Sequence, residues 1–267
     1  MHAAATFIGN ATVLLRIGEF TLLTDPAFGP AGSRVSLGHG LWTKRLRDPV
    51  LDPLEDVDLD AVLLSHLHGD HFDRAARRRL DPGLPILTTP QAERRLRRHF
   101  PAVRGLPTWR SHEWTRGDQR LRVTAVPGRH GPGLADVLLP DVMGSVVEFE
   151  LAGQRGLTLY ITGDTLYMAR LAEIPRRFGP IDAMLIHLGG TRVLGLLVTM
   201  DDRQGTRLTD LIGAGRTIPI HYDDYRVMKS PLSHFLDRSR REAVRGVQPI
   251  TRGETVDLPL RVPGPPD

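Results

Sequence analysis

The chain has 267 residues, of which 40% are hydrophobic and 25% are charged, and its 35 basic and 31 acidic residues leave a net charge of +4. This length and apolar content predict one large domain with a buried core and exclude a largely disordered chain. No apolar run approaches the ~20 residues of a membrane-spanning helix. Because cysteine is absent, disulfides, thiol nucleophiles and cysteine-ligated metals are excluded. We expect a single domain over residues 1–260, a disordered tail at 261–267 and a cytoplasmic location.

The first half of the chain is predicted to pass from strands to alternating strands and helices. Residues 5–25 are short apolar runs broken by glycine-containing pairs, which is typical of a β-meander. Residues 27–53 are rich in Gly, Pro and Arg and are predicted to form one long loop. The elements expected after this loop are a buried strand at 61–65, a helix at 73–80, a strand at 85–88 and a helix at 91–100.

The second half repeats this order in kind. Its expected elements are strands at 121–126, 145–150 and 158–162, then a helix at 165–175 with a strand at 183–187, and a helix at 201–213 with a strand at 216–220. The repetition predicts an α/β fold of two similar halves, packed sheet against sheet with the helices outside.

Arginines gather in two predicted helices, at residues 77–79 and 94–98. We interpret them as solvated helix faces, with nucleic-acid or acidic-partner binding as the alternative. No aromatic residue interleaves these arginines as a base-stacking platform would require.

The strongest chemical motif is His66-x-His68-x-Asp70-His71, directly after the apolar strand. Side chains two residues apart at a strand end point the same way, so His66 and His68 can bind one cation. A turn at Gly69 then directs Asp70 and His71 toward a second position. These ligand types suit Zn²⁺, Mn²⁺ or Fe, whereas unpaired titratable groups at the end of a buried strand would be costly. The motif therefore predicts a metal site.

Three further residues of metal-ligand type stand just after apolar strands. They are His130, Asp164 and His221. Their shared placement predicts that they join the same site.

Taken in order, these residues resemble the ligands of the metallo-β-lactamase-fold hydrolases, and the resemblance runs from about residue 5 to 235. The residues that carry it are His66, His68, Asp70, His71, His130, Asp164 and His221, together with the early Asp25. The resemblance implies a four-layer αβ/βα sandwich with a dinuclear site at the sheet edges. The ligands that it implies are His66, His68 and His130 for one metal, Asp70, His71 and His221 for the other, and Asp164 as a bridge.

Residues 9–15 and 218–222 are most similar to a branch that includes ascorbate-6-phosphate lactonases and N-acyl phosphatidylethanolamine phospholipase D-like proteins. The implied cofactors are two divalent metal ions, with zinc expected and manganese or iron as alternatives. A metal-bridging hydroxide would cleave a phosphodiester or a lactone or other ester bond of a small substrate, phosphorylated substrates included. Asp70 is expected to orient this hydroxide or to transfer a proton.

Two alternatives remain open. A ribonuclease Z-like nuclease shares the ligand pattern, but no basic, Gly/Pro-rich insertion long enough for an RNA-binding arm is visible. A non-hydrolytic di-iron redox protein or inert metal-binding protein is the other. We expect a small-molecule substrate, with neither nucleic acid nor stable membrane insertion, and a homo-oligomer stays open.

Supporting roles are predicted for a few residues near these motifs. Asp25 is expected to accept the free ring N–H of a ligand histidine, with a turn role before Pro26 as the alternative. His187 ends a predicted strand and is expected to contact substrate or to support the ligands, with a plain strand-end role or a ligand role as the alternatives. Tyr222 is expected to line the pocket or to pack in its loop.

Two cations and two loops are candidates for substrate selection. Arg129 and Arg192 could hold a phosphate or carboxylate, or form surface ion pairs. Residues 27–53 and 131–144 are candidate lids.

Overall fold

The computed structural model describes residues 1–52, 54–55, 57–133 and 135–261. Of the tail predicted at 261–267, residues 262–267 lie outside the described part. The first sheet has the strand order β17-β1-β2-β3-β6-β7-β8. Its strands are β1 (Ala3–Gly9), β2 (Thr12–Ile17), β3 (Phe20–Thr24), β6 (Ala61–Leu63), β7 (Ile86–Thr88), β8 (Val103–Gly105) and β17 (Thr255–Asp257).

The second sheet has the order β16-β13-β12-β11-β10-β9. Its strands are β9 (Ser111–Arg116), β10 (Gln119–Pro127), β11 (Met143–Leu151), β12 (Gln154–Ile161), β13 (Ala183–His187) and β16 (Arg216–Ile220). Each sheet begins as an antiparallel meander and continues with parallel strands, from β3 to β6 in the first and from β12 to β13 in the second. This confirms the two similar halves, although the late strand β17 joins the first sheet beside β1.

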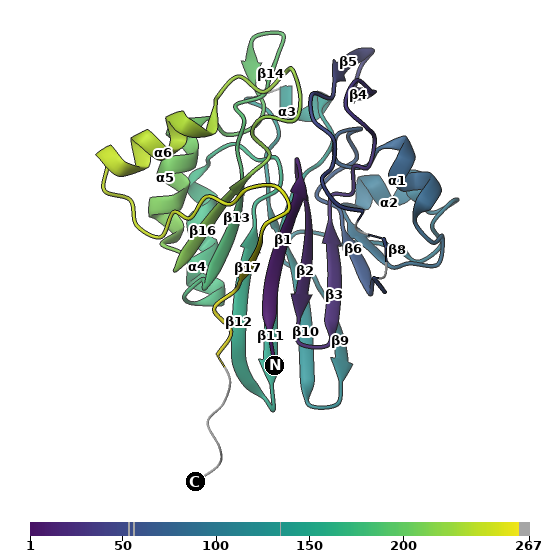
Figure 1. The fold of residues 1–267 in the computed structure, drawn as a ribbon, viewed down its shortest axis with the longest axis vertical. Helices are drawn as coiled ribbons and strands as arrows, with labels where there is room; N and C mark the ends of the chain where they lie inside the picture. The colour runs from purple at the N-terminus through teal and green to yellow at the C-terminus, as the bar shows by residue number, and fades with distance from the viewer. Residues whose placement is uncertain (53, 56, 134, 262–267) are drawn as a thin grey trace.

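Helices cover the outer faces of both sheets, which gives the four-layer sandwich (Figure 1). The first sheet carries α1 (Arg74–Arg79) and α2 (Pro90–Leu96), and the second carries α4 (Glu173–Phe178), α5 (Asp202–Ile212) and α6 (Leu232–Arg241).

Alternation along the strands builds these layers. In β2, Val13 and Leu15 belong to the core between the sheets with Phe149, whereas Leu14 lies in the core beneath the helices with Leu96. Successive side chains of a strand point to opposite faces, so a strand that is apolar at every position is covered on both sides.

The segment predicted as one long loop is partly a hairpin, so that prediction is wrong in its middle. It contains β4 (Arg34–Gly38) and β5 (Leu41–Lys44), joined through His39 and Gly40. Gly38, His39 and Gly40 all have positive φ, which permits the tight turn. The hairpin is short and half exposed, so it leaves little hydrophobic periodicity to detect.

The helix predicted at 165–175 begins later than expected. The chain forms a short 3₁₀ turn, η1 (Ala169–Ala172), and then α4. Pro175 has no N–H and is tolerated only in the first turn of a helix, so α4 can begin only just before it.

Several shorter elements escaped the sequence prediction. These are β8, β9, α6, β17, the helix α3 (Ala135–Leu138) within 131–144, and the hairpin of β14 (Arg192–Val193) and β15 (Leu196–Leu197). Figure 1 shows β4, β5, α3 and β14 at the same end of the molecule. Within the described residues, every helix is too short or too polar to cross a bilayer.

Candidate metal centre

The predicted ligands and their supporting residue Asp25 all follow the carboxyl ends of strands, as the sequence suggested. Asp25 comes directly after β3, and His221 directly after β16. The other ligand segments follow β6, β10 and β12. Parallel and neighbouring strands bring these ends to one edge of the sandwich, where their side chains are buried.

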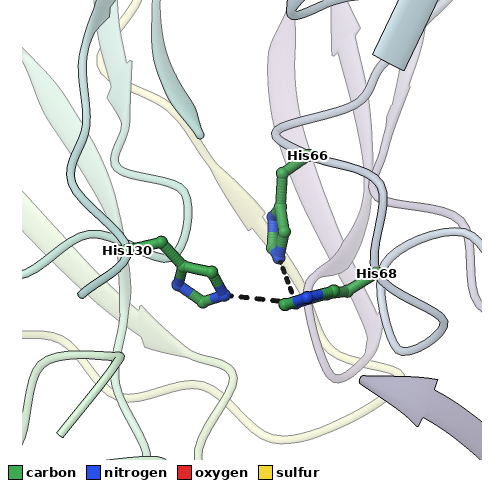
Figure 2. Close-up of side chains that lie close together, drawn as sticks. All are labelled: His66, His68 and His130. Carbon is green, nitrogen blue, oxygen red and sulfur yellow. Dashed lines mark hydrogen bonds between the residues drawn. The ribbon is translucent and has the colours of Figure 1, made fainter. Parts of the chain in front are cut away.

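Three histidines converge on one point (Figure 2). Nδ1 of His68 lies 3.0 Å from Nε2 of His66 and 3.1 Å from Nε2 of His130. Zn–N bonds of the usual length in a tetrahedral site place the ligand nitrogens about 3.3 Å apart. The observed separations are therefore close to those that one shared ion requires.

The outer ring nitrogens of this group are held by the protein. Nδ1 of His130 lies 3.0 Å from the carbonyl oxygen of Val198, and Nδ1 of His66 lies 3.0 Å from the hydroxyl of Ser65. A proton on Nδ1 of His130 leaves the lone pair of Nε2 directed at the centre, which is how ligand histidines are fixed in metal sites.

A second group of buried ligands lies beside the first and consists of Asp70, His71, Asp164 and His221. Nε2 of His71 lies 3.6 Å from Oδ2 of Asp70 and 3.4 Å from Oδ2 of Asp164. Nε2 of His221 lies 3.6 Å from the same oxygen of Asp70. The structure thus separates the predicted ligands into the two sets that the resemblance implies, with Asp164 among the second set.

Asp25 makes the hydrogen bond predicted for it. Its Oδ2 lies 2.9 Å from Nδ1 of His71 and accepts from the hydroxyl of Ser65, while its Oδ1 accepts from the backbone N–H of Ser65. His187, Asp25 and His71 could form a third ligand group, but these bonds already engage both oxygens of Asp25. This carboxylate is placed to orient His71.

Burial and neighbouring charges shift the pKa values of the histidines in opposite directions in the two ligand groups. Burial, followed by the neighbouring His130, lowers the pKa of His68 to about 3, and burial also lowers the pKa values of His66 and His130. Burial opposes the charged form of His71 as well, but the carboxylates of Asp164, Asp70 and Asp25 outweigh it and hold the pKa of His71 well above its ordinary value. The three-histidine group is therefore neutral at pH 7.

The second group carries charge. Burial disfavours the carboxylates, yet His71 and His221 lower the pKa of Asp70 to about 2 and hold the pKa of Asp164 well below its ordinary value. The pKa of His221 is raised, mainly by Asp164 against the effect of burial. The carboxylates thus need compensating positive charge, whether from protons or from divalent cations.

Several buried nitrogen and oxygen atoms of these residues have no hydrogen-bond partner, so the residues present fit a metal ion. Among the described residues, Nε2 of His71, Nε2 of His221, Oδ1 of Asp70 and Oδ1 of Asp164 are buried without a hydrogen-bond partner. Buried polar atoms are normally paired, and imidazole with carboxylate is a donor set for Zn²⁺, Mn²⁺ or Fe. His221 and Asp25 also have positive φ, a strained conformation that clusters at functional sites.

Three supporting residues were missed by the sequence analysis. Asn10 donates to the backbone oxygen of Asp70 and accepts from the N–H of His221 through its own carbonyl. Ser65 touches Asp25 and His66, and Thr199 donates to Oδ2 of Asp164. The sequence held a signal for two of them, because Ser65 precedes the histidine motif and Asn10 lies in the segment 9–15 that carries the resemblance.

The remaining predicted residues lie outside the two ligand groups of the candidate centre. His187 is fully buried, with Nε2 3.5 Å from Oδ2 of Asp25, so it stands behind the ligands. Tyr222 packs against Phe7 with ring centroids 6.2 Å apart. Arg192 is exposed and donates to the carbonyl of Gly195.

The structure also shows where Arg129 and the two candidate lids lie. Arg129 is half-buried next to His130, and its N–H donates to Thr165. The hairpin within 27–53 and the segment 138–140 line one cavity with His68.

The chain matches the family described as the beta-lactamase superfamily domain over residues 21–222. A protein of Carboxydothermus hydrogenoformans named as a metal-dependent hydrolase is 28% identical over 256 residues, which cover 95% of this chain and 99% of that protein.

Solved structures give the same picture. A possible metal-dependent hydrolase from Veillonella parvula aligns with a TM-score of 0.78 and 25% identity, covering 97% of this chain and 100% of that one. An isothiocyanate hydrolase from Delia radicum gut bacteria aligns with a TM-score of 0.79 and 21% identity, covering 96% and 99%, and this likeness shows the fold alone.

Proposed function

The chain belongs to the beta-lactamase superfamily domain family as a metal-dependent hydrolase with the metallo-β-lactamase fold, and on this basis we propose that it hydrolyses a phosphodiester or a lactone or other ester bond of a small substrate. We propose that the reaction uses two divalent metal ions, with zinc favoured by the histidine-rich donor set.

One observation carries this proposal: two groups of buried ligands, contributed by both sheets, adjoin each other with unpartnered lone pairs. His66, His68 and His130 would hold one ion. Asp70, His71 and His221 would hold the other, with Asp164, whose Oδ1 is buried without a hydrogen-bond partner, as the bridge. A site with two such groups is typical of hydrolysis of ester bonds.

When bound, the ions would lower the pKa of a water molecule and polarise the scissile carbonyl or phosphoryl group. Asp70 would orient the attacking water and take part in proton transfer, because its Oδ1 is buried without a partner. Asp25 and the carbonyl of Val198 would keep His71 and His130 in the orientation that this chemistry requires.

The test is hydrolysis of a nitrophenyl phosphodiester and of a simple γ-lactone, side by side, by metal-stripped protein reloaded with Zn²⁺ or Mn²⁺. Asp164→Ala is expected to abolish turnover, whereas Asp210→Ala, an exposed aspartate on α5, is expected to leave it unchanged. Phosphodiester turnover would favour the phospholipase-like and nuclease-like chemistries, and lactone turnover alone would favour the lactonases.

Two results would contradict the proposal. Equal activity of Asp164→Ala and the wild type would place the reaction elsewhere. An iron-loaded preparation that consumes oxygen and hydrolyses neither compound would favour the redox alternative.

A further inference from the structure

A cavity of 570 Å³ adjoins the candidate metal centre. His68, a predicted ligand, forms part of its wall. Its other walls come from α1, α2, the β4–β5 turn and the segment 138–140. Ligand pockets of small-molecule enzymes span ~300–1,000 Å³, so this cavity can hold a substrate beside His68.

Two arginines face this cavity, Arg77 from α1 and Arg95 from α2. Neither forms an ion pair with any described residue. The guanidinium of Arg77 lies over the ring of Phe72, 5.3 Å from its centroid, which restricts its position. No acidic side chain occurs among the described residues of the cavity wall. The cavity wall therefore presents two guanidinium groups and no carboxylate.

The charge of Asp73 acts on Arg77, but the two side chains form no ion pair. Asp73 caps α1 by accepting from the N–H of Ala76, and it also accepts from the N–H of Gly29. By contrast, Arg79 on the same helix is paired with Asp52 at 2.5 Å. The arginine clusters that we interpreted as solvated faces are thus not uniform, because two exposed members line this cavity.

Part of the cavity wall is apolar. Leu67, Leu138, Leu139 and Pro140 line it, and Leu138 is 67% exposed. Nε2 of His39, in the β4–β5 turn, lies 2.5 Å from the carbonyl oxygen of Leu138, so the hairpin and this segment meet across the cavity. A ligand here would find both cations and aliphatic surface.

We propose that Arg77 and Arg95 bind an anionic group, a phosphate or a carboxylate, at the end of the substrate remote from the bond that is cleaved. The apolar wall would cover the part in between, so the substrate is a small amphiphilic anion. Guanidinium groups match both oxyanions by paired hydrogen bonds. This inference rests on the proposed function for the position of the cleaved bond, but the anion site itself does not.

The first experiment measures binding of phenylphosphonate and of phenylacetate to the metal-loaded protein by calorimetry. The double variant Arg77→Gln/Arg95→Gln is compared with Arg94→Gln/Arg98→Gln, which removes the same charge from exposed arginines that do not line the cavity. The cavity variant is expected to bind the anions about tenfold or more weakly, and the control variant to bind them as the wild type does. The stronger of the two ligands identifies the preferred oxyanion.

The second experiment uses two nitrophenyl esters that differ only in a terminal carboxylate. In the cavity variant, KM for the anionic ester is expected to rise about tenfold with kcat little changed, while values for the neutral ester stay the same. Partial recovery in Arg77→Lys/Arg95→Lys would support a charge-based role.

The outcomes separate the two proposals. Equal anion binding in both double variants overturns the anion site, for instance because the phosphonate binds only at the metals. Weakened binding in the cavity variant without hydrolysis of any ester supports the anion site and contradicts the proposed function.

Discussion

At the scale of single residues, His71 lies between the supporting carboxylate of Asp25 and the ligand carboxylates of the second group. Its Nδ1 faces Asp25 and its Nε2 faces Asp164 and Asp70, so its pKa and its tautomer depend on three carboxylates. Asp25 in turn receives two hydrogen bonds from Ser65. A charged acceptor on the far side of a ligand imidazole increases its basicity toward a metal.

Asp25→Asn should therefore weaken metal binding. The amide of the introduced asparagine has one acceptor oxygen for three donors and carries no charge. We therefore expect the affinity for the metal to fall about 10- to 100-fold with the fold retained. Titration with Zn²⁺ in competition with a chelator measures it. Asp182→Asn, which alters a buried aspartate that accepts from Thr158, is the matched control, and equal affinities in both variants would refute the role.

Metal binding should also release protons from the second ligand group. The pKa values of His71 and His221 are raised, so both are largely protonated below their folded-state pKa and must lose a proton to bind a cation. His66, His68 and His130 have lowered pKa values and are already neutral at pH 7. We expect about one or two protons released on filling the second group, and an affinity there that rises with pH.

Calorimetry in buffers of different ionisation enthalpy counts these protons. In His71→Ala the count should fall, whereas an unchanged count would contradict the assignment. The three-histidine group should bind first, with little pH dependence above pH 7.

At the scale of elements, the turns after the strands set where each ligand points. Gly163, between β12 and Asp164, has φ of +62°, and a Cβ there would lie 2.6 Å from the backbone oxygen of Met143. Gly189, after His187, likewise has φ of +99°, and its Cβ would lie 2.7 Å from the backbone oxygen of His221. These glycines let the backbones of neighbouring strands approach at the centre.

Gly163→Ala should lower the free energy of unfolding by more than the left-handed backbone conformation alone explains. Gly153, in the β11–β12 turn, has φ of +77°, and a Cβ added there would have nothing within 4 Å, so Gly153→Ala isolates the cost of the left-handed conformation, about 1–2 kcal/mol. We expect Gly163→Ala to lower the free energy of unfolding by about 1–3 kcal/mol more, and to weaken metal binding through Asp164. Denaturant unfolding measures the loss of stability in both variants, and equal losses would show that the close approach is tolerated.

At the scale of the whole molecule, the candidate centre joins the two sheets. The site residues after β3 and β6 belong to the first sheet and those after β10, β12 and β16 to the second. A bound cation would therefore connect layers that otherwise meet through their apolar core. Binding to the folded state alone stabilises it by mass action.

Removal of the metal should thus lower the melting temperature. At a metal concentration of about 1,000 times Kd the stabilisation is about 4 kcal/mol, which corresponds to a shift on the order of 10 °C for a chain of this size. Thermal unfolding with and without a chelator measures it. His66→Ala should remove the shift, whereas His234→Ala, an exposed histidine, should keep it, and a shift preserved in both would place the metal elsewhere.

Much of the fold could be predicted because its central strands are apolar along their whole length and are bounded by turn residues. The meander of β1, β2 and β3, the strand β13 and the pair of α5 with β16 were found in this way. Short or exposed elements such as β8 and β17 were not, because their few side chains show no clear period. Pairing with the neighbouring strands β7 and β1, rather than local sequence, makes β8 and β17 strands.

The ligand types and their positions at strand ends follow from the amino-acid sequence alone, because a strand, its turn and the next side chain are consecutive in the chain. The resemblance already implied the grouping of the ligands. The packing of the whole chain was needed to decide that Asp25 serves His71, and that Arg77 and Arg95 share a cavity with His68. Those contacts join residues far apart in the chain. They depend on sheet register and layer packing, which local periodicity does not encode.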